Sequence, residues 1–359
     1  MHYYIHIPFC VSRCAYCDFF STTLLHRRQE YVTALISEIQ LRQSSAPSTI
    51  YFGGGTPSTL YPTDIKRILD TVSPIEYRQS AEITLEANPG DLTSDKLQQL
   101  QRMGINRLSI GIQSFNNRLL QLIGRRHNAQ EAINAVHKAQ EAGFDNISID
   151  LIYGLPNQDI ASWKKDIDTA LSLNIQHLSC YCLSYEQGTK MTQLLERGEL
   201  QEQDEETLNY MYDYLCDTMK NNGFVHYEIS NFALPGRYSR HNSSYWTDES
   251  YIGLGAGAHS YDAEKRIRSW NVSDLNEYIS CICRGRRPSE EENITDEQHR
   301  MEQIMLGLRT CHGVSKDLIP ESPQLADYLS RRFLRDTGTH YIVTSTGLHL
   351  LNRIIQDLT

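Results

Sequence analysis

Three cysteines near the N-terminus constrain this chain more than any other feature of its sequence. Cys10, Cys14 and Cys17 follow the strand-like run Tyr3–Ile7 in the pattern C-x3-C-x2-C. A loop of this length can bring three thiolates to three corners of an iron–sulfur cubane, which leaves one iron open. Two-cluster ferredoxins use a different spacing, and structural zinc normally takes four ligands. The spacing therefore favours a [4Fe–4S] cluster; the alternative is buried thiols, or a zinc site completed by His6.

The open iron of such a cluster needs a chelating ligand, and S-adenosylmethionine (SAM) supplies one through its amino and carboxylate groups. Gly53-Gly54-Gly55 can let the backbone approach a small charged ligand, although a tight strand-to-helix turn explains the same triplet. Glu86, at the end of the next strand-like run, is a candidate partner for the ammonium group of SAM. Arg125 and Asp150 are candidates for its carboxylate and ribose hydroxyls; the alternative for each is an ordinary surface charge.

Composition and charge exclude two classes of function. The chain has 359 residues, of which 40% are apolar and 22% charged, as in an ordinary globular protein. Its net charge of −10 argues against a general nucleic-acid binder, and the short basic run 284–287 is best explained as a solvated loop. It has neither a membrane-spanning apolar run nor a signal-peptide pattern. We expect a cytoplasmic protein, not integral to a membrane, whose nine cysteines are thiols or metal ligands.

Strand-like and helix-like runs alternate through the first half of the chain. The strand-like runs are Tyr3–Ile7, Thr49–Phe52, Glu82–Ala87, Arg107–Ile112, Asn146–Ile152 and His177–Leu183. Helical periodicity lies between them, around 27–43, 62–72, 93–103, 128–142 and 159–173. Apolar strands of this kind are typical of a parallel α/β sheet. Right-handed crossovers would curl it into a partial (β/α)6 barrel with ligands at the carboxyl ends of the strands.

The pattern changes in the second half. A helical run over 203–222 precedes an irregular, Gly-rich segment over 223–261 and a second helical run over 273–283. Helical runs over 299–310 and near 323–335 then lead to a strand-like Tyr341–Thr344 and a final helix. These elements predict a small, mainly helical, winged-helix-like C-terminal domain. We place the boundary at residue 288, which gives a barrel domain with accessory strands and loops over 1–288 and a C-terminal domain over 289–359.

Longer motifs make the sequence resemble a known family over nearly its whole length. They are YIHIPFC (4–10), CAYCDF (14–19), YFGGGTPS (51–58), LEANPG (85–90), RLSIGIQSF (107–115), SIDLIYGLP (148–156), HNSSYW (241–246) and GLGAGAHSY (253–261). The sequence is similar to the radical SAM family of the oxygen-independent coproporphyrinogen III dehydrogenases and the related HemW heme chaperones. The resemblance implies a radical SAM barrel that holds a [4Fe–4S] cluster and SAM.

The resemblance also implies roles for individual positions. Cys10, Cys14 and Cys17 match the cluster ligands, and the positions that match SAM contacts are Tyr4, Gly54 and Glu86. The dehydrogenases use further positions for a second SAM, which here are Tyr16, Gly55, Thr56, Gln113, Arg125 and Asp150. Ser184 and His259 also fall at contact positions, but their identities differ from those in the dehydrogenases.

Two departures separate this chain from the dehydrogenases. Their cluster motif ends in a fourth cysteine where this chain has Phe19, and they carry a long N-terminal extension where only nine residues precede Cys10. Both departures match the heme chaperones, as does HNSSYW. The resemblance favours heme delivery to acceptor hemoproteins, including membrane-associated respiratory enzymes, with a cytosolic electron donor. The alternatives are a coproporphyrinogen III dehydrogenase and a radical SAM enzyme with another substrate.

His241 in the HNSSYW segment is the candidate axial ligand for heme iron, because neutral imidazole is a common donor. Tyr245 and Trp246 are candidates for stacking on a porphyrin face. The alternative is a hydrogen-bonded loop histidine beside core aromatics. The remaining cysteines lack metal-ligand spacing, and we interpret them as core or incidental thiols: Cys180, Cys182, Cys216, Cys281, Cys283 and Cys311.

Overall fold

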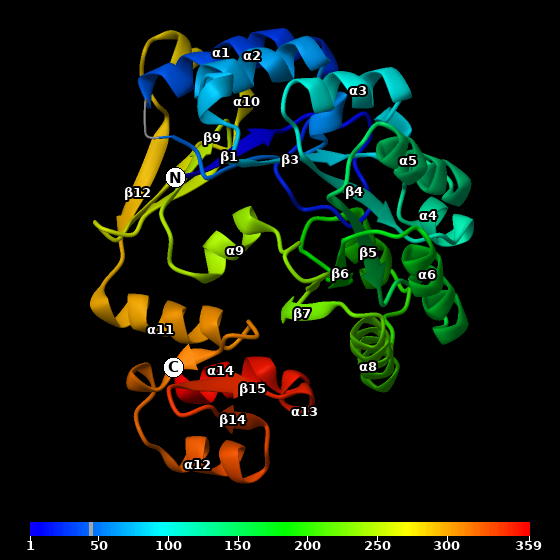
Figure 1. Cartoon of the computed structure of the whole chain (residues 1–359), viewed down its shortest axis with the longest axis vertical. Helices are drawn as coiled ribbons and strands as arrows, with labels where there is room; N and C mark the ends of the chain where they lie inside the picture. The colour runs from blue at the N-terminus through cyan, green and yellow to red at the C-terminus, as the bar shows by residue number, and fades with distance from the viewer. Residues whose placement is uncertain (43–45) are drawn as a thin grey trace.

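A curled sheet with helices along its outer side forms the larger part of the computed structural model, which describes residues 1–42 and 46–359 (Figure 1). Its first strands are β1 (His2–Ile7), β2 (Thr49–Gly54), β3 (Glu82–Ala87), β4 (Arg107–Gln113), β5 (Ile147–Tyr153) and β6 (His177–Cys182). Every neighbouring pair from β1 to β6 is parallel. This confirms the predicted parallel α/β barrel.

The helices that connect these strands are α1 (Arg28–Leu41), α2 (Pro62–Val72), α3 (Ser94–Arg102), α4 (Asn117–Leu122), α5 (Ala129–Glu141) and α6 (Ile160–Ser172). The expected helix over 27–43 corresponds to α1, and residue 43 lies outside the described residues. Short 3-10 turns add η1 (Leu25–Arg27), η2 (Pro57–Thr59), η3 (Ile75–Tyr77) and η4 (Pro89–Asp91). Successive side chains along each strand point to opposite faces of the sheet. On β4, Leu108 and Ile110 are buried in the main apolar core, whereas Ser109 and Gln113 line a cavity inside the barrel.

The region predicted to be irregular, 223–261, is instead largely ordered into short strands and a helix. After α7 (Lys190–Glu196) and α8 (Glu205–Asn221) come β7 (Val225–Glu228), β8 (Asn231–Ala233), α9 (Arg240–Trp246), β9 (Tyr251–Leu254), β10 (His259–Asp262), β11 (Ile267–Asn271), α10 (Leu275–Cys283) and β12 (Ser289–Asn293). Over the described residues the sheet order is β12-β11-β10-β9-β1-β2-β3-β4-β5-β6-β8-β7. The prediction was wrong because these strands are short, and two of them, β8 and β9, pair with strands far away in the sequence.

A second unit with its own apolar core follows. Its elements are α11 (Asp296–Gly307), β13 (Val314–Ser315), η5 (Lys316–Leu318), α12 (Pro323–Ser330), β14 (Leu334–Asp336), β15 (His340–Val343), α13 (Ser345–Leu348) and α14 (Leu351–Leu358). Its buried core extends from Ile304 to Leu358. The boundary at residue 288 stays a prediction; β12 lies just beyond it and pairs with β11 of the large sheet. Among the described residues, no helix has the length and apolar character that crossing a membrane requires.

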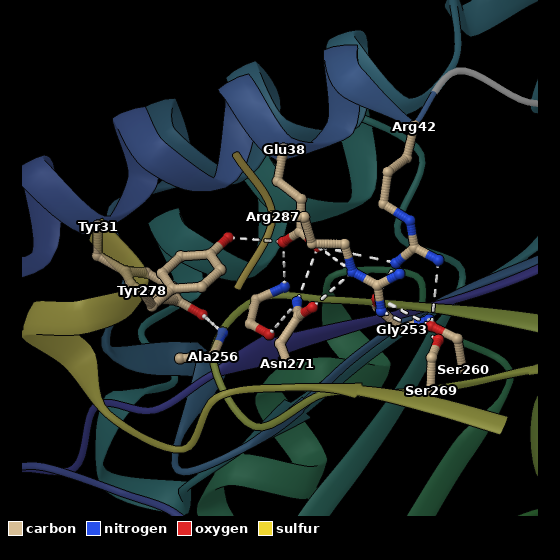
Figure 2. A network of polar contacts seen from close by, with 11 residues as sticks. Tyr31, Glu38, Arg42, Gly253, Ala256, Ser260, Ser269, Asn271, Tyr278 and Arg287 are labelled. Carbon is tan, nitrogen blue, oxygen red and sulfur yellow. Dashed lines mark hydrogen bonds and ion pairs between the residues drawn. The ribbon is translucent and has the colours of Figure 1, made fainter. Parts of the chain in front are cut away.

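A buried carboxylate on α1 joins the antiparallel part of the sheet to the barrel (Figure 2). The side chain of Glu38 is 0% exposed. It accepts hydrogen bonds from the Gly255 backbone N–H (2.7 Å), the Tyr278 hydroxyl (2.7 Å) and the Asn271 amide (2.8 Å). Its Oε1 also has two arginine neighbours, Arg42 Nη1 at 3.7 Å and Arg287 Nε at 3.9 Å. A buried charge is stable only when it is paired and hydrogen-bonded, so this carboxylate fixes α1, α10 and the β9–β10 turn together.

We expect Glu38→Gln to lower the free energy of unfolding by about 3 kcal/mol, because an amide nitrogen cannot accept the hydrogen bonds of a carboxylate oxygen. Urea denaturation monitored by circular dichroism measures the change. Glu30→Gln on the exposed side of the same helix is the control, and should change stability by less than about 0.5 kcal/mol. Equal stability of the two variants would show that the Glu38 contacts contribute little.

Candidate functional site

A cavity of about 430 Å³ lies inside the barrel at the carboxyl ends of the parallel strands. The residues that line it include all the predicted cluster ligands and most of the predicted SAM contacts: Cys10, Cys14, Tyr16, Cys17, Gly54, Gly55, Thr56, Glu86, Gln113, Arg125, Asp150 and Ser184. Parallel strands place their carboxyl ends at one edge, so segments far apart in the sequence meet here. The structure therefore brings these residues together, and the individual contacts with ligands stay predictions.

The cysteine loop has the chemistry that an iron–sulfur cluster needs. Cys10 Sγ lies 3.4 Å from the Thr56 hydroxyl, and Arg125 Nη1 donates to Cys14 Sγ at 3.3 Å. Arg125 Nε is buried and has no hydrogen-bond partner among the described residues, so it can serve an anionic ligand. Within the described residues, no group of three His, Cys, Asp or Glu side chains is arranged to hold a single metal ion. A cubane binds each thiolate on a different iron and accepts wider spacing, so the loop fits a cluster better than zinc.

The glycine turn beside the cysteine loop is required by packing within the chain. Gly54 has a φ of +105°, and a Cβ there would lie 2.5 Å from the His6 ring. A Cβ on Gly55 would lie 2.8 Å from the Pro8 carbonyl carbon. These contacts support the tight-turn explanation of the triplet. Contact of the two glycines with SAM stays a prediction.

Two carboxylates lie in the floor of the cavity. Glu86 accepts a hydrogen bond from the Tyr51 hydroxyl at 2.8 Å, and Asp150 accepts one from the Ser109 hydroxyl at 3.2 Å. Burial raises the pKa of Glu86 to about 7, although the bond from Tyr51 acts in the opposite direction. Burial also raises the pKa of Asp150. A cationic ligand would stabilise both carboxylates in the charged form, which suits the ammonium and sulfonium groups of SAM.

Two of the predicted SAM contacts do not line the cavity. The Tyr4 hydroxyl lies 3.1 Å from His6 Nδ1, and its ring stacks on that of Tyr51. His259 is exposed on β10, where its ring stacks on Trp270 at a centroid distance of 5.8 Å. Their roles remain predictions that rest on the resemblance alone.

Comparisons with known proteins identify the family. The Radical SAM superfamily profile matches residues 4–170. The protein named heme chaperone HemW in Lactococcus lactis is 35% identical, with 98% of this chain and 96% of the relative covered. The one in Bacillus subtilis is 39% identical, over 89% of this chain and 86% of the relative. This chain belongs to the HemW family of radical SAM proteins. Membership implies a [4Fe–4S] cluster and SAM.

The fold of this HemW-family chain also matches a solved structure. Coproporphyrinogen III oxidase (HemN) from Escherichia coli superposes with a TM-score of 0.82, covering 99% of this chain and 88% of HemN. The identity is 22%, so the match is evidence for the shared fold. It confirms the predicted radical SAM barrel with its C-terminal unit.

The heme candidates of the HemW-family motif lie on α9, at the opposite end of the barrel from the cysteines. His241 is 1% exposed, and burial lowers its pKa to about 3. Its Nδ1 lies 2.6 Å from the Thr49 hydroxyl, and its Nε2 lies 2.8 Å from the Tyr245 hydroxyl. Neither nitrogen is free to bind iron, which fits the alternative of a hydrogen-bonded histidine, on a helix instead of a loop. Trp246 ends α9, half-buried. The heme roles of these residues stay predictions.

Sequence reasoning missed several residues in and beside the cavity. The Tyr51 hydroxyl donates a hydrogen bond to Glu86. Tyr181 lines the cavity and is 43% exposed. The inward face of each strand follows from alternation with apolar neighbours, which was a usable signal for both. Phe19 and Arg13 at the mouth lie in the loop after β1 and not in a strand, so alternation gives no signal and only the structure places them there.

Replacing Cys10, Cys14 or Cys17 with Ala should abolish the cluster, because each thiolate binds a different iron. Protein purified without oxygen should hold about four irons per chain, and the variants almost none. Iron analysis and visible absorption measure this. Cys180→Ala, which removes a buried thiol on β6, is the control that keeps its iron. Stoichiometric zinc in place of iron would contradict the assignment.

SAM affinity should rise as the pH rises through about 7, because Glu86 is protonated below that pH and cannot pair with an ammonium group. Glu86→Gln should bind SAM about tenfold more weakly above that pH and lose most of the pH dependence. Titration of SAM against the spectrum of the reduced cluster measures both effects. Glu76→Gln on exposed η3 is the matched control. A Glu86 variant with the pH profile of the control would show that another group binds the ammonium.

Proposed function

We propose that this protein is a heme chaperone that binds a [4Fe–4S] cluster, SAM and heme, and passes heme to acceptor hemoproteins. The observation that carries the proposal is its similarity, over nearly the full length, to proteins named heme chaperone HemW. Phe19 in place of a fourth cysteine supports it, as does the HNSSYW segment. We place the protein in the cytoplasm, with an electron donor and with acceptors that include membrane-associated respiratory enzymes.

In this proposal the residues of the cavity divide the work of holding SAM. Bound to the open iron and reduced by one electron, SAM can supply a deoxyadenosyl radical. Glu86 would hold the ammonium group, Arg125 the carboxylate and Asp150 the ribose hydroxyls. Arg125 also donates to Cys14, so one guanidinium would connect the cluster loop to the ligand. All three side chains are partly exposed to the cavity, so a bound SAM would displace water from them and strengthen each of these contacts.

Heme binding separates the chaperone from a coproporphyrinogen III dehydrogenase. We expect hemin to bind the reconstituted protein at one per chain and to transfer to an apo-hemoprotein. We expect no conversion of coproporphyrinogen III with SAM and a reductant. His241→Ala tests the candidate ligand: if it binds iron, the heme spectrum should change while the iron of the cluster remains. Turnover of coproporphyrinogen III with no measurable heme affinity would replace the chaperone proposal with the dehydrogenase.

A further inference from the structure

Phe19 presents an aromatic ring at the mouth of the cavity. Its side chain is 64% exposed although it lines the cavity, whereas the neighbouring apolar residues Phe9 and Ala15 are buried. Burying a large apolar side chain contributes about 1.5–3 kcal/mol, so this ring retains binding energy that the fold does not use. Single exposed apolar side chains are common on protein surfaces, but Phe19 differs from Tyr77 on η3 because the Phe19 ring lines a cavity that also has polar walls.

Positive side chains lie around the same mouth. Arg13 is exposed there and makes no ion pair with any described residue. Arg126 also lines the cavity and pairs with Asp91 at 3.1 Å. The carboxylates at this rim are Asp18 and Glu186. In a chain of net charge −10, an unpaired guanidinium beside an exposed aromatic ring suits a ligand that is both apolar and anionic.

We propose that heme binds at this mouth, with one porphyrin face against Phe19 and its propionates paired with Arg13 and Arg126. The inference rests on the proposed function and names the heme site within it. Heme has the chemistry that the rim requires, since it is a planar apolar ring with two carboxylates at one edge. A cavity of about 430 Å³ is within the size range of a single small-molecule site, so we place the cluster and SAM inside it and heme above it.

The alternative site on α9 is closed in this structure. Both ring nitrogens of His241 are engaged, one beside Thr49 and the other beside Tyr245. Iron ligation there would break a buried hydrogen bond. Phe19 and Arg13 need no rearrangement, because their side chains already face solvent.

Phe19→Ala should weaken hemin binding at least about tenfold, and Phe19→Trp should restore it, because Trp keeps an aromatic face. Tyr77→Ala is the matched control, since Tyr77 is 63% exposed on η3 and lies outside the cavity. Hemin titration by absorbance measures affinity, and iron analysis confirms that each variant keeps its cluster. If Phe19→Ala bound hemin with an affinity within twofold of that of the unmodified protein, the proposed heme site would be wrong.

The role of Arg13 and Arg126 is tested with a second porphyrin, hemin dimethyl ester. The double variant Arg13→Gln, Arg126→Gln should bind hemin about tenfold more weakly at low salt, yet bind hemin dimethyl ester as well as the parent does, because the ester has no propionate charge. If the double variant lost the same affinity for hemin and for hemin dimethyl ester, the pairing of the propionates with Arg13 and Arg126 would be wrong. Loss of hemin on His241→Ala, with Phe19→Ala unaffected, would move the site to α9. If the parent binds no hemin, the proposed function fails together with the site.

Discussion

The parallel pairing of β1 with β2 is the interaction on which the whole site depends. His6 lies opposite Gly53 in this pair, and the Gly55 N–H donates to the Ile7 carbonyl where the strands end. The cysteine loop therefore leaves β1 directly beside the glycine turn. Pairing of β2 with β3 then adds Glu86 to the same edge. A slip of one residue would turn every inward side chain toward the helices, so the cluster loop and the acidic floor are positioned by one register.

The strands that could be predicted from the sequence are those whose pattern is local. β1 to β6 each carry enough alternating or apolar residues to identify them, and the helices between them show their own periodicity. Asn231–Ala233 is too short to show a period, and it exists because it pairs with β6. The antiparallel extension likewise depends on Glu38, whose partners come from distant segments such as Gly255 and Asn271. Contacts between segments that are far apart in the sequence cannot be recognised from the residue pattern of either segment alone.

The candidate site was predictable where position in the topology decides it. Cys10, Gly54 and Glu86 all lie at or just beyond strand ends, so a parallel sheet brings them to one edge. The direction and partners of a side chain are decided by packing, and sequence could not supply these for His241. The exposure of Phe19 was also beyond reach, because apolar side chains occur both buried and exposed and the packing of the loop decides which.

The two ends of the barrel differ in how readily they admit a ligand. At the amino end, the backbone N–H groups of Arg240 and His241 both donate to the buried carboxylate of Glu82, each at 3.0 Å. Moving α9 would leave that carboxylate without these donors, at a cost of about 1–3 kcal/mol for each lost partner. The carboxyl end has its cavity already formed. A heme held over that cavity would lie beside SAM and the cluster and would cover the route to both, so in the proposed arrangement SAM binds before heme and leaves after it.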